Sequence, residues 1–311
     1  MLSKKNSFNP ILVIVVVGSL SASGVWVGVQ IKDLIDPPPQ PQRIIVFVHG
    51  INSDADCEPK SKDGFRALWD YISSEGVLGL DDNQTPYVFS YAKSDAEDDS
   101  GKDCDGAANY NKIDTCSSIY GDGGHSDRFG AWFDEIRANN DRAEFDIIAH
   151  SMGGVVVLHW LSRLGEQPSQ VRSIITLDSP LQGRSLDLWE KIVAQFAAPC
   201  RGMPAIEDLK PDSATIMALN EPLAPGSYPD ECIPGEVTDI SRLARILTVR
   251  NNADLVVLKA VACMPGADDF PADCRDGLTI KFWVWIASHS CVFTDPDVQA
   301  RIKTELLTEQ P

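Results

Sequence analysis

One short segment, Ala149–Gly154 (AHSMGG), constrains the fold of this chain more than any other. It follows the apolar run Phe145–Ala149, which is typical of a buried strand, and it leads into Met152–Leu164, where apolar side chains recur at helical spacing. The residues two positions before and after Ser151 are small, so the chain can bend sharply there. Such a turn lifts a serine hydroxyl clear of the sheet, beside the positive end of a helix. We therefore predict a strand–turn–helix unit that presents Ser151 as a nucleophile.

Segments typical of strands and of helices alternate along the chain. This alternation predicts an α/β fold, with a mostly parallel, doubly wound sheet flanked by helices on both faces. Region 182–243 interrupts it with a helical stretch near 186–197 and a Pro-rich stretch, and we interpret it as a small cap insertion over the site. Region 92–124 is polar and is expected to be a long solvated loop. The expected strands are 44–48, 87–91, 145–149, 171–177, 244–249 and 278–286, and the expected helices are 65–72, 128–138, 152–164 and 295–307.

The N-terminal part of the sequence predicts a membrane-directed segment ahead of the catalytic domain. Residues 1–10 form a short basic segment, expected in the cytoplasm, and 11–31 are an apolar run. At about 1.5 Å per residue this run crosses a hydrocarbon core of roughly 30 Å, so we favour a transmembrane signal anchor. A cleaved signal peptide ending near the small residues 21–24 is the alternative, and a buried core helix is a third. Residues 32–42 are a Pro-rich linker, and 43–308 form the catalytic domain. The anchor leaves this domain outside the cytoplasm on the membrane, and a cleaved signal releases it by secretion.

Charge and cysteine content narrow the classes of partner. Acidic residues outnumber basic ones 45 to 27, whereas a nucleic-acid-binding domain needs Lys and Arg to displace counterions from phosphates. We therefore expect no nucleic-acid partner. The 8 cysteines include no C-x-x-C pair, which argues against a zinc site. Most lie in stretches typical of loops, which favours disulfides in an oxidising compartment. Cys200 and Cys232 both bound the expected cap and are the favoured single pair.

His289 is the residue expected to act as the base. A serine hydroxyl becomes a good nucleophile only when a base takes its proton. His289 follows an expected strand, and in doubly wound sheets the ligand side lies at the C-terminal ends of the strands. His125, in the polar loop, is the main rival. The other histidines are His49 in the early loop, His150 beside the serine, and His159 on the helix behind it.

Asp254 is the residue expected to orient the base. In this architecture the acid lies between the serine and the histidine in the sequence. Asp254 follows the expected strand 244–249, which is the last one before the strand that leads to His289. Asp178, directly after the strand 171–177, is the rival, although an aspartate there is also suited to capping the next turn.

Two backbone N–H groups are needed to stabilise the oxyanion that forms during attack on a carbonyl. One is expected from Met152, the residue after the nucleophile, and the other from the loop after an early strand. We assign the second to Ile51, because in Val48–Asn52 (VHGIN) a buried strand ends at a glycine that permits an unusual turn. Gly153 and Gly154 are expected to let the helix approach the sheet closely.

At these residues the sequence resembles the α/β-hydrolase superfamily of lipases and esterases, and it is particularly similar to small secreted bacterial lipases. The resemblance implies an α/β-hydrolase fold and hydrolysis of carboxylic esters first, then of thioesters or amides. Asn52 stands where such lipases usually carry a second glycine, and the region 92–124 and the cysteines have no counterpart in the minimal lipases. The similarity covers roughly residues 43–308 and rests on VHGI at 48–51, AHSMGG at 149–154, TLDSPLQG at 176–183, DLVV at 254–257 and SHS at 288–290.

The leading hypothesis is therefore a membrane-tethered serine hydrolase of the esterase or lipase type. Its expected partners are a small-molecule or lipid ester substrate and the membrane, and it is expected to need no cofactor and no metal. An acyltransferase or thioesterase on the same site is an alternative. A non-catalytic binding module on the same fold is another, although the presence of a serine, a histidine and an aspartate in the expected order disfavours it.

Overall fold

The computed structural model of the chain divides into two units, Met1–Gln40 and Pro41–Pro311, and the described residues all belong to the second. The predicted N-terminal segments up to residue 31 therefore lie outside the described part. Within that part, no helix has the length and apolar character needed to cross a bilayer. The structure describes residues 42–51, 65–74, 86–89, 91, 116–164, 168–183, 200, 203–221, 239, 245–251, 262, 264, 267–272 and 291–308.

A parallel six-stranded sheet in the order β2-β1-β3-β4-β5-β6 forms the centre of the second unit. Each neighbouring pair of strands runs parallel, as the alternation of strands and helices predicts. The strands in the middle of the sheet are buried along almost their whole length, which explains their continuous apolar sequences. The strands are β1 (Arg43–Val48), β2 (Tyr87–Phe89), β3 (Glu144–His150), β4 (Val171–Leu177), β5 (Ile246–Asn251) and β6 (Asp268–Ala272).

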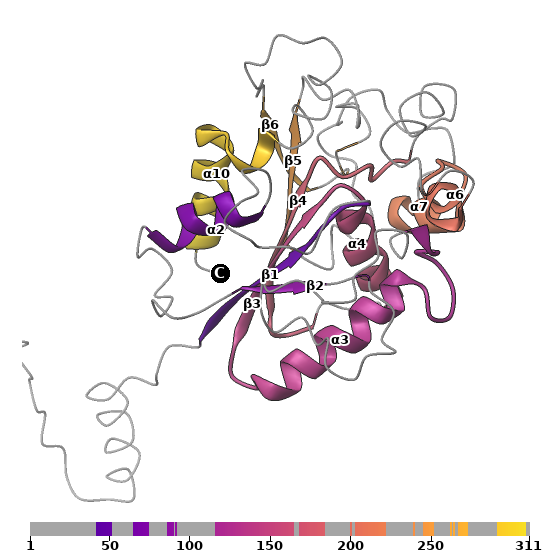
Figure 1. Cartoon of the computed structure of the whole chain (residues 1–311), viewed down its shortest axis with the longest axis horizontal. Coiled ribbons are helices and arrows are strands. Elements are labelled where there is room, and N and C mark those ends of the chain that lie inside the picture. Colours follow the sequence, from indigo (N-terminus) through magenta and orange to yellow (C-terminus); the bar gives the residue numbers. More distant parts are fainter. Residues whose placement is uncertain are drawn as a thin grey trace, which may run out of the picture. The chain divides into compact units, whose positions relative to one another are not determined.

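Helices cover both faces of this sheet (Figure 1), so the predicted doubly wound arrangement is confirmed. Side chains that alternate along β1 enter two separate cores. Ile44 and Val46 pack into the core beneath α3 and α4. Ile45 and Phe47 pack into the core beneath α2 and α10. The helices are α2 (Phe65–Ser74), α3 (His125–Asn139), α4 (Met152–Leu164), α6 (Pro204–Asp208), α7 (Ala214–Asn220) and α10 (Pro296–Leu307), with a short 3-10 helix, η4 (Cys291–Phe293), before α10.

The last described strand, β6, is one that the sequence analysis missed. Its sequence (DDFPA) is polar and partly exposed, so it lacks the apolar run used to recognise the other strands. Among the described strands it is the last in the order of the sheet and pairs with β5. The strand expected at 278–286 lies outside the described residues.

The described part of the predicted cap contains α6 and α7. α7 packs against α4, and the side-chain amide of Asn220 donates a hydrogen bond of 2.9 Å to the carbonyl of Leu181, just after β4. This part of the region 182–243 is therefore fastened to the sheet domain. The helix expected near 186–197 lies outside the described residues, and the covering of the site by this region stays a prediction.

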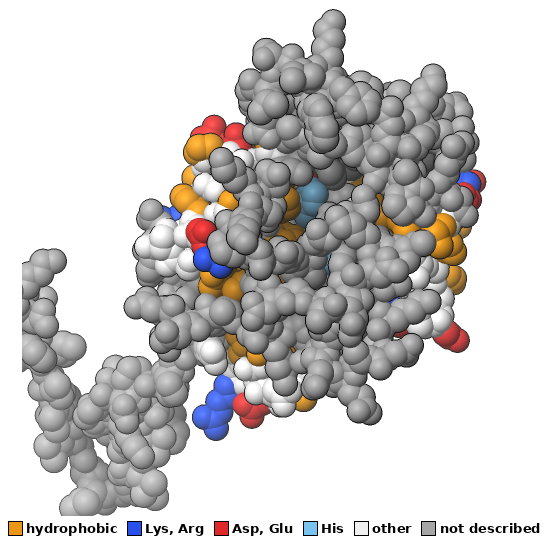
Figure 2. Space-filling model, in the orientation of Figure 1, with side chains coloured by type: hydrophobic (Ala, Val, Ile, Leu, Met, Phe, Trp, Pro, Cys, Tyr) orange, Lys and Arg blue, Asp and Glu red, His pale blue; other side chains and the backbone are white. Residues whose placement is uncertain are grey.

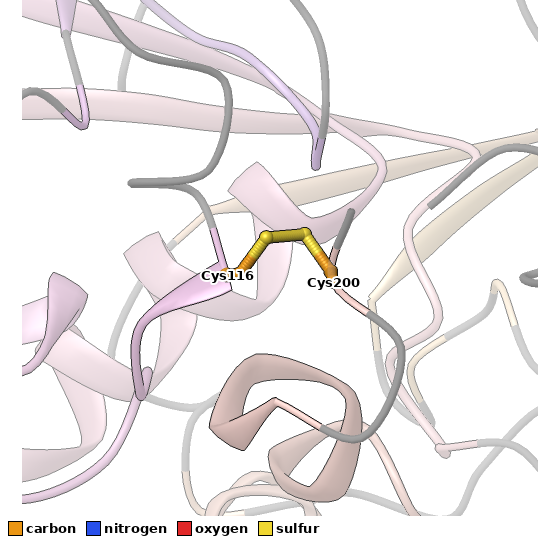
Figure 3. Close-up of a disulfide and its surroundings, with 2 residues drawn as sticks. All are labelled: Cys116 and Cys200. Atoms are coloured by element: carbon orange, nitrogen blue, oxygen red, sulfur yellow. A yellow bond between two sulfur atoms is a disulfide. The ribbon is translucent and has the colours of Figure 1, made fainter. Parts of the chain in front are cut away.

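A disulfide joins Cys116 to Cys200, with their Cα atoms 4.9 Å apart (Figure 3). The predicted pair Cys200–Cys232 is therefore wrong. Position at the two boundaries of a cap does not decide which segments meet, whereas here the segment before α3 lies against the segment before α6. Asp208 in α6 reinforces this contact, because its carboxylate accepts hydrogen bonds from the hydroxyl of Ser118 (2.6 Å) and the backbone N–H of Ile119 (2.7 Å).

Candidate active site

Ser151 occupies a sharp turn between the end of β3 and the start of α4. Its φ is 54°, in the left-handed region that residues other than glycine rarely adopt. Two backbone hydrogen bonds hold it there: its N–H donates to the carbonyl of Leu177 (2.9 Å), and its carbonyl accepts from the N–H of Gly154 (3.1 Å). The residue is 8% exposed. The predicted strand–turn–helix unit is present, with its strain concentrated on the serine.

The loop after β1 runs directly against this turn. A Cβ atom added to Gly50 would lie 2.7 Å from the Cβ of Ser151 and 3.2 Å from its Oγ, so no larger residue fits without a shift. Ile51, the predicted oxyanion donor, follows Gly50 and is half-buried. Met152, the other predicted donor, is buried at the first position of α4. Gly50, the residue before Ile51, thus lies against Ser151, and Met152 follows Ser151 in the chain, whereas the role of the two N–H groups stays a prediction.

Two further glycines allow α4 to begin close to the sheet, as predicted. A Cβ atom on Gly153 would lie 2.3 Å from the carbonyl oxygen of Val48, and one on Gly154 would lie 2.1 Å from the Oγ of Ser179. The first turn of α4 therefore sits against the loops that follow β1 and β4. This contact points the N-terminus of α4 toward the C-terminal ends of the strands, where Ser151 lies. The positive end of the helix dipole points the same way.

Two buried histidines enclose Tyr91 near the loop after β1. The rings of His49 and His125 both lie edge-on to the Tyr91 ring, at centroid distances of 4.6 Å. The Tyr91 hydroxyl donates to the carbonyl of His49 (2.8 Å), and the Nδ1 atom of His49 lies 3.0 Å from the Gly50 carbonyl. This packing holds the backbone around Gly50. His125, the rival base, is fully buried at the start of α3 within the same aromatic group.

Asp254 and His289, the predicted acid and base, lie outside the described residues, but their near neighbours in the sequence do not. Asn251 ends β5, three positions before Asp254, and η4 begins two positions after His289. In η4, the ring of Phe293 lies 4.7 Å from the ring of His150, the residue before Ser151. Asn251 and η4 therefore both lie at the C-terminal ends of the strands, where Ser151 also lies.

Asp178, the rival acid, occupies the corresponding turn after β4. It is fully buried and has a φ of 44°. Its Oδ1 atom accepts a hydrogen bond of 2.5 Å from the backbone N–H of Asn251, and its own N–H donates to the carbonyl of Val249 (2.8 Å). The carboxylate thus binds the end of the next strand. The residues around Asp178 do not predict this contact, because it joins residues 73 positions apart along the chain.

His159 lies behind the nucleophile on α4, away from the turn. Burial is the main reason that its pKa is lowered, and the nearby Arg163 lowers it further, partly opposed by Asp208 and Asp127. Its Nδ1 atom lies 3.0 Å from the hydroxyl oxygen of Ser126, which in turn donates to the carbonyl of Val156 (3.1 Å). A neutral, hydrogen-bonded histidine fits a role in packing α3 against α4.

A metal site requires several ligand side chains close together, and a basic surface requires Lys and Arg side chains close together. Among the described residues, no group of three or more His, Cys, Asp or Glu side chains is arranged to hold a metal ion. The coloured Lys and Arg side chains on the face shown in Figure 2 are scattered rather than gathered.

Comparison with known proteins agrees with this architecture. A model of the alpha/beta hydrolase fold family matches residues 89–203, which include the turn at Ser151. The propeptide form of the lipase BlEst2 from Bacillus licheniformis superposes with a TM-score of 0.50 at 14% identity, covering 88% of this chain and 51% of that one. The phospholipase PlaB from Legionella pneumophila gives a TM-score of 0.50 at 15% identity, covering 86% of this chain and 60% of that one.

The present chain thus spans about half and three-fifths of the length of these two structures. Identities this low concern the fold, and no curated protein matches the sequence significantly. The order of the strands and the left-handed turn at the end of β3 agree with the family match. Together they show that this chain has the α/β-hydrolase fold.

Proposed function

We propose that this protein is a serine hydrolase that cleaves carboxylic esters, with Ser151 as nucleophile, His289 as base and Asp254 as the orienting acid. The observation that carries the proposal is the strained turn: Ser151 has a φ of 54°, and its side chain lies against the backbone of Gly50. Strain at a sharp strand-to-helix turn is typical of nucleophile positions, because it exposes one hydroxyl at the end of the sheet. A lipase and a phospholipase are among the solved structures that share the fold.

In the first step, the imidazole of His289 takes the hydroxyl proton of Ser151 while the serine oxygen bonds to the ester carbonyl carbon. The carbonyl oxygen becomes negatively charged and accepts hydrogen bonds from the backbone N–H groups of Ile51 and Met152. Loss of one such donor costs about 10²–10³ in turnover in other hydrolases. The C–O bond to the leaving alcohol then breaks, and His289 gives that alcohol its proton. The acyl group remains on the Ser151 oxygen.

In the second step, water replaces the alcohol. His289 takes a proton from water while the water oxygen bonds to the acyl carbon, and the oxyanion forms again in the same place. The bond from the acyl carbon to the Ser151 oxygen then breaks, and His289 returns the proton to that oxygen, which releases the carboxylic acid and restores the serine hydroxyl. Asp254 holds the imidazole in the required tautomer and stabilises its charged form in both steps. The N-terminus of α4 adds a favourable potential for the oxyanion, worth about 0.3–1 kcal/mol at exposed sites.

The direct test is active-site labelling with a fluorophosphonate probe, together with hydrolysis of p-nitrophenyl esters of graded chain length. We expect the wild-type protein to be labelled at Ser151 and Ser151→Ala to lose both labelling and hydrolysis. Ser162→Ala is the matched control, because Ser162 lies on the same helix and only donates to the carbonyl of His159 (2.8 Å). Labelling that persists in Ser151→Ala would refute the nucleophile. The chain length with the highest kcat/KM reports the substrate class.

We further propose that the catalytic domain lies outside the cytoplasm, tethered by residues 11–31 or released if that segment is cleaved. Three described cysteines, Cys116, Cys200 and Cys291, are all disulfide-bonded, and disulfides persist in oxidising compartments. The test is alkylation of thiols in intact cells before lysis, with membrane and soluble fractions compared. Export predicts that these three cysteines resist alkylation until reduction. Ready alkylation of all three would contradict it.

A further inference from the structure

We propose that Asp178 is a positioning residue: its carboxylate fixes the end of β5, and thereby the chain that carries the acid and the base, relative to Ser151. This inference rests on the proposed function. Asp178 lies one position beyond Leu177, which pairs with His150 in the register of β3 and β4. The turns at Ser151 and Asp178 are therefore side by side at one edge of the sheet.

The first contact runs from β4 to β5. The strands pair in parallel up to Leu177 and Val249. Beyond that pair, the N–H of Asp178 donates to the carbonyl of Val249 (2.8 Å), and the Oδ1 atom of Asp178 accepts from the backbone N–H of Asn251 (2.5 Å). Asp178 and Asn251 are both fully buried. The carboxylate thus extends the pairing of the two strands past the point where the backbone of β4 turns away.

The second contact runs from β5 to the chain after His289. The side-chain amide of Asn251 donates to the Sγ atom of Cys291 (3.2 Å), and both residues are buried. Cys291 is itself disulfide-bonded, which restrains η4. A continuous set of contacts therefore leads from the turn beside Ser151, through Asp178 and Asn251, to the start of η4.

This set of contacts matters for the reaction because of where the two partners fall in the sequence. Asp254 follows Asn251 by three positions, and His289 precedes Cys291 by two. Both partners are thus close along the chain to residues whose positions the Asp178 carboxylate helps to set. In other enzymes, a misplacement of about 1 Å caused by a change outside the chemistry costs on the order of 10²-fold in rate. A buried carboxylate that accepts a backbone N–H is suited to prevent such a shift.

The two possible roles of Asp178, positioning residue and triad acid, require different properties of its side chain. A positioning residue needs a hydrogen-bond acceptor and tolerance of positive φ, and asparagine supplies both. A triad acid needs its negative charge, and replacement by asparagine lowers turnover by about 10⁴. The pair of substitutions Asp178→Asn and Asp178→Gly therefore separates the two roles. Glycine keeps the backbone turn, which a φ of 44° requires, and removes only the acceptor.

The experiment measures kcat, KM and the pH profile on a short-chain p-nitrophenyl ester for these two variants and for Asp254→Asn. We expect Asp178→Asn to stay within about fivefold of wild type, because a neutral oxygen still accepts the N–H of Asn251. Asp178→Gly should lose about 10²-fold in kcat, with KM nearly unchanged. Its acid limb should move to lower pH, because a displaced acid stabilises the histidine cation less and so lowers the pKa of the base. A purely structural role would lower the amount of folded protein and leave that limb in place.

Fluorophosphonate labelling separates failure of this inference from failure of the proposed function. If Ser151 is not labelled in the wild type, the proposed function fails, and the positioning role fails with it because it rests on that function. If Ser151 is labelled and Asp178→Asn is as inactive as a triad variant while Asp254→Asn is active, Asp178 is the acid itself and the positioning role is overturned. A folded Asp178→Gly with full kcat overturns it as well.

Discussion

Ser151 and Asp178 follow paired residues at the ends of two neighbouring parallel strands, and both have a positive φ, 54° and 44°. The hydrogen bond from the Ser151 N–H to the carbonyl of Leu177 links the two turns directly. Strain of this kind costs on the order of 1–3 kcal/mol per residue and persists only where surrounding contacts enforce it. Here two neighbouring buried turns are both strained. We therefore expect the chemistry at the C-terminal ends of these strands.

Gly50→Ala should abolish most of the activity. The new Cβ would lie 2.7 Å from the Cβ of Ser151 and must displace either the nucleophile or the loop that carries Ile51. A displacement of about 1 Å predicts a loss on the order of 10²-fold in kcat. Gly123→Ala is the matched control, because its Cβ meets nothing within 4 Å and only its positive φ of 75° is disturbed. Steady-state kinetics on one ester decides, and equal kcat values for the two variants would count against the close approach.

Replacing both cysteines, in Cys116→Ser/Cys200→Ser, should lower stability and activity together. The bond closes a sequence separation of 84 residues, and bonds of this kind contribute about 2–4 kcal/mol to the free energy of unfolding. Ile51 packs against the apolar cluster around the disulfide, so its loop loses support when the bond is absent. Urea unfolding and kcat measure the two effects. Peptide mapping without reduction is the check on pairing: a Cys200–Cys232 peptide in place of Cys116–Cys200 would contradict the structure.

Asp146→Asn should destabilise the fold without changing the chemistry. The Asp146 carboxylate is fully buried, ion-paired with Arg43 and with Arg172 (2.8 Å), and accepts a hydrogen bond from Ser173 (2.6 Å). Removing one member of a buried charge group typically costs about 3–5 kcal/mol. These residues lie near the starts of their strands, at the end of the sheet opposite Ser151, so kcat per folded molecule should be unchanged.

The matched control for Asp146 is Asp134→Asn, which breaks an exposed ion pair with Arg137 on α3. Exposed pairs of this kind contribute about 0.2–1 kcal/mol. Both variants are compared by urea unfolding and by active-site titration with the fluorophosphonate probe. A similar small loss of stability in the two variants would show that the buried group is not a significant contributor.

His159→Asn should reduce the loss of stability that acid causes. Burial lowers the pKa of His159, so as the pH falls the unfolded chain binds a proton at this residue before the folded protein does. The free energy of unfolding contributed by this residue therefore decreases as the pH falls below about 6.5, the unperturbed value. The side-chain amide of asparagine places an N–H near the position of the His159 Nδ1 atom, where it can donate to the Ser126 hydroxyl oxygen, and asparagine does not titrate. Urea unfolding at pH 7.5 and 5.5 measures the difference, and identical losses in wild type and variant would exclude His159 as a contributor.

Local sequence pattern determined much of this fold. The expected bounds of the helix 152–164 and of the strand 171–177 are those of α4 and β4. In α2, the four apolar residues at helical spacing, Phe65, Leu68, Trp69 and Ile72, are the buried ones. These features depend on residues a few positions apart, so burial of one face imposes a period that the sequence itself displays. The same holds for the turn at Ser151, whose small neighbours are part of the motif.

The tertiary structure decided which distant segments meet. Neither the pairing of Cys116 with Cys200 nor the hydrogen bond from Asn251 to Asp178 leaves a periodic pattern in the sequence. Strand β6 likewise has a polar sequence, and among the described strands it pairs with β5. The contact between Asp178 and Asn251 exists because parallel strands bring their C-terminal ends, and the loops that follow them, to one edge of the sheet. The sequence determined the residue types at this edge and the turn that bears Ser151, whereas their mutual contacts arise only when the sheet assembles, because they join residues far apart along the chain.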